Sequence, residues 1–185
     1  PTSCGGESEL RMPIRNVVYR QREAGQVLTD LSDYRRAGGY EALRTALTEM
    51  DRDEAVYAFV RSGLRGRGGA GFPMGRKASF IPKDSVLPAY VVCNADESEP
   101  RTFKDRELMV TNPFQLLEGI TLAGYAIGAV RGYIYIRGEY EHQARILDAA
   151  IAQARTAGFL GQGVAGSGFD FDITIHVGAG AYVCG

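Results

Sequence analysis

Residues 63–80 have the composition of a loop that binds an anion, and we call this stretch the glycine-rich loop. Its first thirteen residues include six glycines. Glycine weakens a helix or strand interior by about 0.5–1 kcal/mol relative to alanine, so this density indicates bare backbone that approaches a ligand. Exposed N–H groups next to cations favour a phosphate, whereas the alternative is a mobile surface linker. The cations are Arg65, Arg67, Arg76 and Lys77.

Two further segments follow predicted strands and carry groups that could contact a nucleotide. Residues 94–99, the acidic loop, hold three carboxylates, and residues 178–185 are again rich in glycine. Ligands of open α/β sheets bind at the carboxyl ends of the strands, so we expect these segments to meet the glycine-rich loop at one edge. There the carboxylates could accept hydrogen bonds from ribose or ring groups, while Phe72 and Phe80 stack on flat rings. The three segments together predict a nucleotide site.

The acidic loop has other interpretations. It could be a solvated turn, or it could supply metal ligands or the acid and base of a hydrolase. A binding module without catalysis is a third class. A serine or cysteine triad is not indicated, because His142 falls in an amphipathic helix and His176 in a strand. We therefore expect no catalytic side chain and no metal ligand.

The composition is that of one globular domain of 185 residues, 45% hydrophobic and 23% charged. A net charge of -1 gives no field that would attract nucleic acid or an anionic membrane. Cys4, Cys93 and Cys184 form no Cys-x-x-Cys pair, so neither a zinc site nor a disulfide framework is indicated and a reducing cytoplasm is favoured. The apolar run 114–130 contains Glu118 and is shorter than the roughly 20 residues of a membrane span. We expect it to be a buried helix.

The spacing of apolar residues predicts an α/β fold. From residue 89 onward the elements read as βαβαβ, with two successive helices in the first crossover, which favours a Rossmann-like parallel sheet with right-handed crossovers, preceded by a helical segment. We expect residues 1–33 to be an N-terminal arm without a signal peptide, and residues 34–185 to be the nucleotide-binding domain. The expected helices cover residues 32–39, 40–50, 51–62, 103–111, 112–130 and 141–157, and the expected strands cover residues 89–93, 132–137 and 169–177.

The order of these elements bears on the kind of nucleotide loop. Gly66, Gly68 and Gly71 fit the pattern Gly-x-Gly-x-x-Gly. A dinucleotide fingerprint of the usual kind follows a strand and opens a helix, but this pattern follows a predicted helix, which we expect to bury Val56, Phe59 and Val60. A variant loop is therefore expected. The chain also stops directly after a strand exit, so we expect it to be a fragment that binds flavin weakly or not at all.

Four motifs in this order resemble the NADH-binding flavoprotein subunit of respiratory complex I. They are residues 63–77, residues 93–100 with Lys104-Asp105-Arg106, residues 132–140, and residues 178–185. The resemblance runs from about Tyr34 to the last residue, and the same module occurs in NAD-reducing hydrogenases and NAD-dependent formate dehydrogenases. It implies FMN and NADH as ligands. It also shows departures: Ala78 where the family usually has tryptophan, Met74 for a small hydroxyl residue, and Arg101 where glycine is usual.

The resemblance implies roles for single residues. The segment from Gly66 to Gly69 would approach the FMN phosphate with Lys77 near the nucleotides, Phe72 and Phe80 would stack with NADH, and Tyr182 would lie against FMN. The acidic loop would line the flavin and nicotinamide pocket. The implied cofactor-binding residues are Gly66, Arg67, Gly68, Gly69, Ala70, Gly71, Phe72, Gly75, Lys77, Phe80, Asn94, Asp96, Glu97, Glu99, Gly178, Ala179, Gly180, Ala181, Tyr182, Cys184 and Gly185.

The resemblance also implies a setting. NADH would pass a hydride to FMN, and electrons would continue singly through iron–sulfur clusters to quinone. The implied partners are a thioredoxin-like iron–sulfur subunit and a large iron–sulfur subunit, on the cytoplasmic side of the membrane and without direct insertion. A [4Fe–4S] cluster is expected only in a C-terminal part that this chain lacks. Alternatives are the diaphorase subunit of a hydrogenase or formate dehydrogenase, and a nucleotide-binding module without catalysis.

Overall fold

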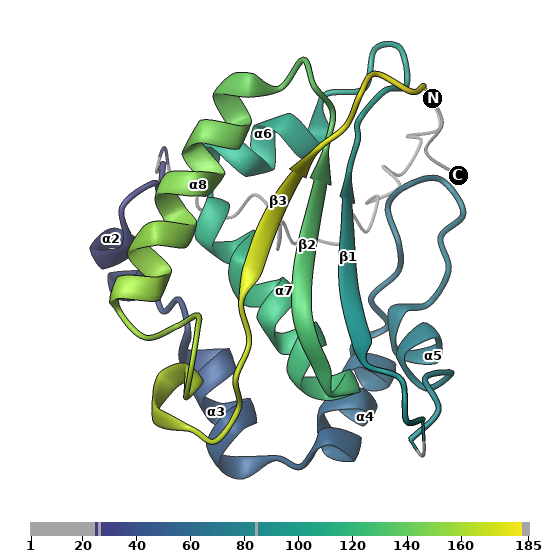
Figure 1. The fold of residues 1–185 in the computed structure, drawn as a ribbon, viewed down its shortest axis with the longest axis vertical. Helices are drawn as coiled ribbons and strands as arrows, with labels where there is room; N and C mark the ends of the chain where they lie inside the picture. Colours follow the sequence, from purple (N-terminus) through teal and green to yellow (C-terminus); the bar gives the residue numbers. More distant parts are fainter. Residues whose placement is uncertain (1–24, 26, 84, 183–185) are drawn as a thin grey trace, which may run out of the picture.

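A computed structural model of the chain describes Gly25 and residues 27–83 and 85–182. In this part, a parallel three-stranded sheet of order β1-β2-β3 is joined by helical crossovers, as the sequence predicts (Figure 1). The strands are β1 (Ala89–Ala95), β2 (Ala129–Ile136) and β3 (Ile173–Val177). The helices are α2 (Leu31–Arg36), α3 (Glu41–Glu49), α4 (Arg52–Ser62), α5 (Met74–Ala78), α6 (Lys104–Thr111), α7 (Pro113–Ile127) and α8 (Glu141–Thr156), with a short 3-10 helix, η1 (Val164–Gly166).

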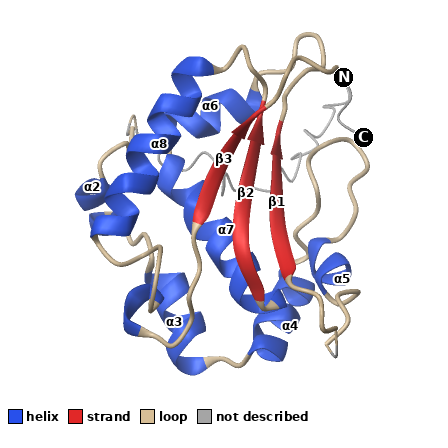
Figure 2. Ribbon diagram, viewed as in Figure 1, coloured by secondary structure: helices blue, strands red, loops and turns tan. Residues whose placement is uncertain are grey.

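The core lies between the sheet and the helices α7 and α8 (Figure 2). Helix α7 packs against β1 and β2, and α8 packs against β3 and α7. Leu117 of α7, Ile134 of β2 and Leu147 of α8 are fully buried at this contact. Such residues are expected to stabilise a fold by about 1.5–3 kcal/mol each, so this layer fixes the strand ends from which the polar loops leave.

Local sequence signals set the ends of the helices. Asp51 and Glu54 form a capping box at the start of α4, each side chain accepting from the other residue's N–H at 2.8 Å. Gly63 ends α4 in the left-handed conformation, with φ at +65°. Gly128 ends α7 in the same way, so the predicted extension of this helix to Val130 is wrong and β2 begins three residues before the predicted Gly132.

The prediction of burial for residues 51–62 is also wrong. Helix α4 buries Ala55, whereas Val60 is 50% exposed, because α4 lies at the margin of the core. Strand β1 is not buried on both faces, since Val92 is 66% exposed and Tyr90 is exposed on the same face. The third strand is shorter than predicted, because Phe171 pairs with Gly161 in an isolated antiparallel bridge instead of continuing β3.

The segment before α3 packs onto the domain. Leu28 is buried, and its N–H donates to the carbonyl of Thr111 at 2.7 Å. The N–H of Leu31 donates to Gln153 Oε1 at 3.0 Å. The boundary at residue 33 stays a prediction, and residues 1–24 of the expected arm lie outside the described residues. None of the helices in the described part of the chain has the length and apolar character that crossing a bilayer requires.

Candidate functional site

The glycine-rich loop is a hairpin closed at its base and open at its tip. Arg65 and Pro73 pair in an antiparallel bridge, and the N–H of Gly66 donates to the carbonyl of Phe72 at 2.9 Å. The residues from Arg67 to Ala70 are exposed, and Gly69 has a φ of +105°, a conformation that favours glycine. In the view of Figure 1 this hairpin stands beside β1. It follows α4 directly, which confirms that it is not a strand-to-helix turn.

Gly75 connects the loop to the rest of the fold. A Cβ at this position would lie 2.4 Å from the backbone nitrogen of Val60 and 2.7 Å from the carbonyl carbon of Phe59. Helix α5 therefore approaches the backbone of α4 as closely as it does only because residue 75 is glycine. The sequence implies a cofactor contact for Gly75, but the structure gives it a packing role that sets the position of α5, which carries the exposed Lys77.

The two expected stacking residues lie together at the foot of this loop. Phe72 and Phe80 are 42% and 60% exposed, and their ring centroids are 6.2 Å apart. The guanidinium of Arg76 lies 5.9 Å from the centroid of Phe72 and 5.8 Å from that of Phe80. Both rings thus present apolar surface near a fixed positive charge, which suits a flat, negatively charged ligand.

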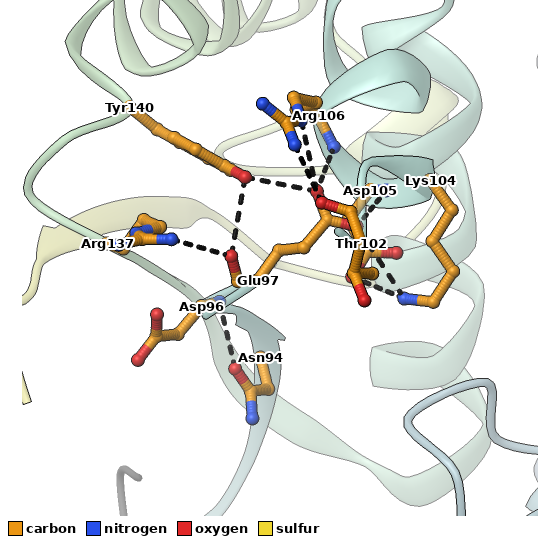
Figure 3. A network of polar contacts seen from close by, with 9 residues as sticks. All are labelled: Asn94, Asp96, Glu97, Thr102, Lys104, Asp105, Arg106, Arg137 and Tyr140. Atoms are coloured by element: carbon orange, nitrogen blue, oxygen red, sulfur yellow. Dashed lines mark hydrogen bonds and ion pairs between the residues drawn. The ribbon is translucent and has the colours of Figure 1, made fainter. Parts of the chain in front are cut away.

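The acidic loop leaves the carboxyl end of β1 and turns at once. Asn94 Oδ1 accepts from the N–H of Asp96 at 2.9 Å, and the Ser98 hydroxyl donates to the carboxylate of Asp96. Glu99 is exposed. These bonds set the direction of the chain, in which Asn94 and Glu99 are exposed and Glu97 between them is buried. Figure 3 shows Asn94, Asp96 and Glu97 at this turn.

Glu97 does not have the environment that the sequence implies. Glu97 is only 4% exposed. Its carboxylate accepts hydrogen bonds from the backbone N–H groups of Asp105 at 2.8 Å and of Arg106 at 3.2 Å, both in the first turn of α6. The Tyr140 hydroxyl donates to the same carboxylate at 3.1 Å. Burial and the neighbouring Glu97 charge raise the pKa of Tyr140, so this hydroxyl stays protonated and can donate. Glu97 therefore caps a helix, and its oxygens face protein donors.

The segment after β3 meets the acidic loop, as the sequence predicts. The Tyr182 hydroxyl donates to Glu99 Oε2 at 2.9 Å, and this bond raises the pKa of Tyr182. A Cβ at Gly178 would lie 2.7 Å from the Tyr135 hydroxyl, so a glycine here lets the chain pass close to β2. Ala179, Gly180 and Ala181 are exposed beside this contact, whereas the implied site residues Cys184 and Gly185 lie outside the described residues.

The described residues offer little for the alternative chemistries of the acidic loop. No group of three or more histidine, cysteine, aspartate or glutamate side chains among them could hold a metal ion. Cys93 lies in β1, where burial raises the pKa of its thiol to about 11, so it carries no charge at neutral pH.

A cavity of about 820 Å³ lies next to the end of α5 that carries Lys77. It is lined by α4, by residues within 78–83 and 85–89, and by the turn between α7 and β2, at the amino end of β1. Ala78, where the resemblance leads us to expect tryptophan, lines this cavity.

The sequence predicted no role for Arg137 or Tyr140, which both bind Glu97 of the acidic loop. Arg137 Nη1 donates to the backbone carbonyl of Glu97 at 2.9 Å (Figure 3). Their position was the only sequence signal for such a role. They directly follow the predicted strand at residues 132–137, which is expected to pair with the strand that precedes the acidic loop. Nothing in the sequence joins residues 97 and 140, which only the pairing of β1 with β2 brings together.

The chain is similar to known proteins over most of its length. Residues 60–185 match the family described as the Nuo51 FMN-binding domain. One NADH-quinone oxidoreductase relative, in Rhizobium meliloti (strain 1021), is 56% identical over 155 residues, which is 84% of this chain and 37% of the relative. The corresponding component of the same enzyme in Escherichia coli (strain K12) is 51% identical over 170 residues, 91% of this chain and 38% of the relative.

A solved structure is also similar. The crystal structure of an NAD+-reducing [NiFe]-hydrogenase in the air-oxidized state superposes with a TM-score of 0.63 at 40% identity, covering 72% of this chain and 22% of that chain. The chain thus spans less than two fifths of the curated relatives and about a fifth of the hydrogenase chain that it matches. The shared region holds all three segments of the candidate site.

Proposed function

The chain belongs to the family of the Nuo51 FMN-binding domain, and on that premise we propose that it forms the flavin- and NADH-binding part of an NADH dehydrogenase flavoprotein subunit. The observation that carries the proposal is the open, cationic glycine-rich loop. Nothing lies within 4 Å of a Cβ built at Gly68 or Gly69, so the tip leaves room for a phosphate next to the exposed Arg67, and α5 adds the exposed Lys77 after the base of the loop. The residues present therefore fit the phosphate group of FMN.

The residues of the chain have distinct tasks in this proposal. Backbone groups of residues 66–71 with Arg67 and Lys77 hold the phosphate, because oriented N–H groups and cations favour an anion. Phe72 and Phe80 hold the flat rings of NADH. The acidic loop and Tyr182 line the flavin and the nicotinamide. Bound FMN supplies the chemistry, accepting a hydride and releasing electrons one at a time, while the protein binds and orients.

Orientation is also the only catalytic contribution that this site requires. Hydride transfer between two bound rings needs no side chain to move a proton, in keeping with the absence of a triad among the described site residues. Holding both partners in a reactive geometry contributes up to about 7–11 kcal/mol of barrier reduction. Binding of both nucleotides at one edge of the sheet is thus sufficient for the proposed reaction.

The setting follows from the relatives. We propose that the protein works within a larger complex, passing electrons to a thioredoxin-like and a large iron–sulfur subunit and then to quinone, at the cytoplasmic face of the membrane. The NADH-quinone oxidoreductase relatives support this interpretation. A diaphorase role beside a hydrogenase is the second candidate, favoured by the structural similarity to the NAD+-reducing enzyme. A formate dehydrogenase partner would use the same site.

Reversing the charge of the loop tests the phosphate assignment. In the full-length protein, Arg67→Glu combined with Lys77→Glu replaces two attractive contacts with repulsion, a loss of about 3 kcal/mol or more and hence at least a hundredfold in the Kd for FMN. Arg44→Glu with Arg145→Glu is the matched control, since it makes the same change of net charge on the exposed faces of α3 and α8. Flavin absorbance after gel filtration measures retention.

The control variant should keep its flavin, and the loop variant should lose it. Retention of flavin with unchanged affinity by the loop variant would refute the assignment. Addition of NADH to the flavin-loaded wild type then separates the enzyme from a module without catalysis. Bleaching of the flavin is expected, and a spectrum that NADH leaves unchanged would support the non-catalytic alternative.

A further inference from the structure

Arg137 and Tyr140 attach the acidic loop to the rest of the fold from a distant part of the sequence. Both follow the end of β2, about forty residues after Glu97. Arg137 Nη1 donates to the backbone carbonyl of Glu97 at 2.9 Å, and the Tyr140 hydroxyl donates to Glu97 Oε2 at 3.1 Å. Figure 3 shows the two side chains converging on Glu97 from the same side. One residue of the loop is thus held by both its backbone and its side chain.

The remaining bonds of Glu97 make this attachment rigid. Its buried carboxylate also accepts from the N–H groups of Asp105 and Arg106, so three donors share its two oxygens. A buried carboxylate is stable only when such donors satisfy it, and removing one leaves part of its desolvation cost uncompensated. The position of Glu97 therefore depends on the tyrosine hydroxyl as well as on α6.

Arg137 and Tyr140 are themselves held in place. Arg137 makes a two-pronged ion pair with Glu139, with Nε at 3.0 Å from Oε2 and Nη2 at 2.9 Å from Oε1. The Arg137 guanidinium lies 5.3 Å from the centroid of the Tyr140 ring, and that of Arg106 lies 5.8 Å from it. A tyrosine ring between two cations has little freedom to turn, so its hydroxyl points at Glu97 in a defined direction.

From this geometry we propose that Arg137 and Tyr140 are positioning residues for the acidic loop. The inference rests on the proposed function, in which Asn94, Asp96 and Glu99 face the flavin and the nicotinamide. Glu97 lies between these residues, so fixing Glu97 fixes the peptide groups on either side. Neither Arg137 nor Tyr140 needs to touch a ligand. A displacement of about 1 Å in residues that orient a substrate costs up to a hundredfold in rate, so a lost anchor is measurable in the reaction.

The test compares two tyrosines in the full-length, flavin-loaded protein within its complex. Tyr140→Phe removes the hydroxyl that reaches Glu97 and keeps the ring. Tyr125→Phe is the matched control, because the Tyr125 hydroxyl donates to the backbone carbonyl of Met50 at 2.6 Å, far from the acidic loop in the fold. The measurements are KM for NADH, kcat with a soluble one-electron acceptor, the reduction potential of the bound flavin, and the thermal unfolding temperature.

We expect Tyr140→Phe to lower kcat/KM for NADH by about threefold to tenfold, as for the loss of one hydrogen bond, and to shift the flavin potential. Tyr125→Phe should leave both unchanged, although it also loses a hydroxyl bond. Equal kinetics and equal potentials in the two variants would overturn the proposal, because a purely structural bond would change only the unfolding temperature.

Arg137→Lys provides a second, independent arm. Lysine keeps the charge but lacks the fork that binds the Glu97 carbonyl and Glu139 together, so kcat/KM is expected to fall in the same direction. If Tyr140→Phe does not retain flavin, the lysine variant decides, and wild-type kinetics there count against the proposal. If NADH does not reduce the flavin of the wild-type protein, the proposed function itself is refuted. That outcome is distinct from the failure of the positioning role.

Discussion

Replacing Gly75 with alanine should destabilise the protein, although alanine is the better helix former. A Cβ at this position would lie 2.4 Å from the backbone nitrogen of Val60 and 2.6 Å from its Cα. These are backbone atoms of α4, so no side chain can turn away to make room. Helix α5 would have to retreat from α4, and it would carry Lys77 and the foot of the glycine-rich loop with it.

The size of the effect follows from two opposing terms. Overpacking costs about 1–3 kcal/mol, and the helix propensity of alanine returns up to about 1 kcal/mol. When the propensity gain is complete, the net loss in the free energy of unfolding is therefore up to about 2 kcal/mol. Gly119→Ala is the matched control, since Gly119 lies within α7 with nothing within 4 Å of its built Cβ.

Urea unfolding of the full-length protein distinguishes the two substitutions by sign. Gly119→Ala should stabilise by about 0.5–1 kcal/mol, because only helix propensity changes. Gly75→Ala should destabilise and should weaken flavin retention, since α5 carries Lys77. A stabilising Gly75→Ala would refute the close approach of α5 to α4 on which this reasoning depends.

Three other predictions concern single residues. Arg101 has a φ of +68°, in the left-handed region that favours glycine. Arg101→Gly should therefore raise the free energy of unfolding, measured in urea, by up to about 1 kcal/mol, because relief of this strain outweighs the added freedom of the unfolded chain. A lower free energy of unfolding would contradict this. The buried Glu118 carboxylate accepts from the Tyr34 hydroxyl and from the N–H groups of Tyr40 and Leu43. Glu118→Leu should cost about 3–5 kcal/mol in urea unfolding, because these three donors lose their acceptor, and Glu118→Gln should cost less. Equal losses would contradict the role of Glu118 as their acceptor. The Cys93 thiol, with its pKa raised to about 11, should alkylate slowly at pH 8 and rapidly in urea, measured by mass spectrometry of its peptide; fast labelling in the fold would exclude its burial.

Local signals in the sequence were enough to predict most elements of the fold. Asp51, and Asn112 with Pro113, are short-range signals, and each sits where the structure begins a helix. The alternating strand residues predicted the strands themselves but not their first residues. The errors in the predicted element boundaries also arose from such short-range signals. A glycine that ends a helix can equally lie inside one, so the sequence alone does not distinguish the left-handed turn at Gly128 from a further residue of α7.

The acidic loop shows why the site could be predicted only in outline. Asp96, Glu97 and Glu99 are the same kind of residue within four positions, so the sequence treats them alike. The structure separates them, with Glu97 capping α6 and Glu99 exposed beside Tyr182. The partners that decide this, α6 and Tyr140, are fixed by the crossover and by strand pairing. Composition carries no information on such distant pairs.

Both loops of the candidate site are fixed at one point and open elsewhere. The glycine-rich loop is held at its base by the pairing of Arg65 with Pro73 and by Gly75 against α4, and the acidic loop is held at Glu97. Because the bases are already ordered, a ligand would have to order only the tips, which reduces the entropic cost of binding. Substitutions at the bases should therefore change stability and binding together. Substitutions of the exposed Arg67 side chain at the tip, or of the exposed Lys77 side chain on α5, should change binding alone.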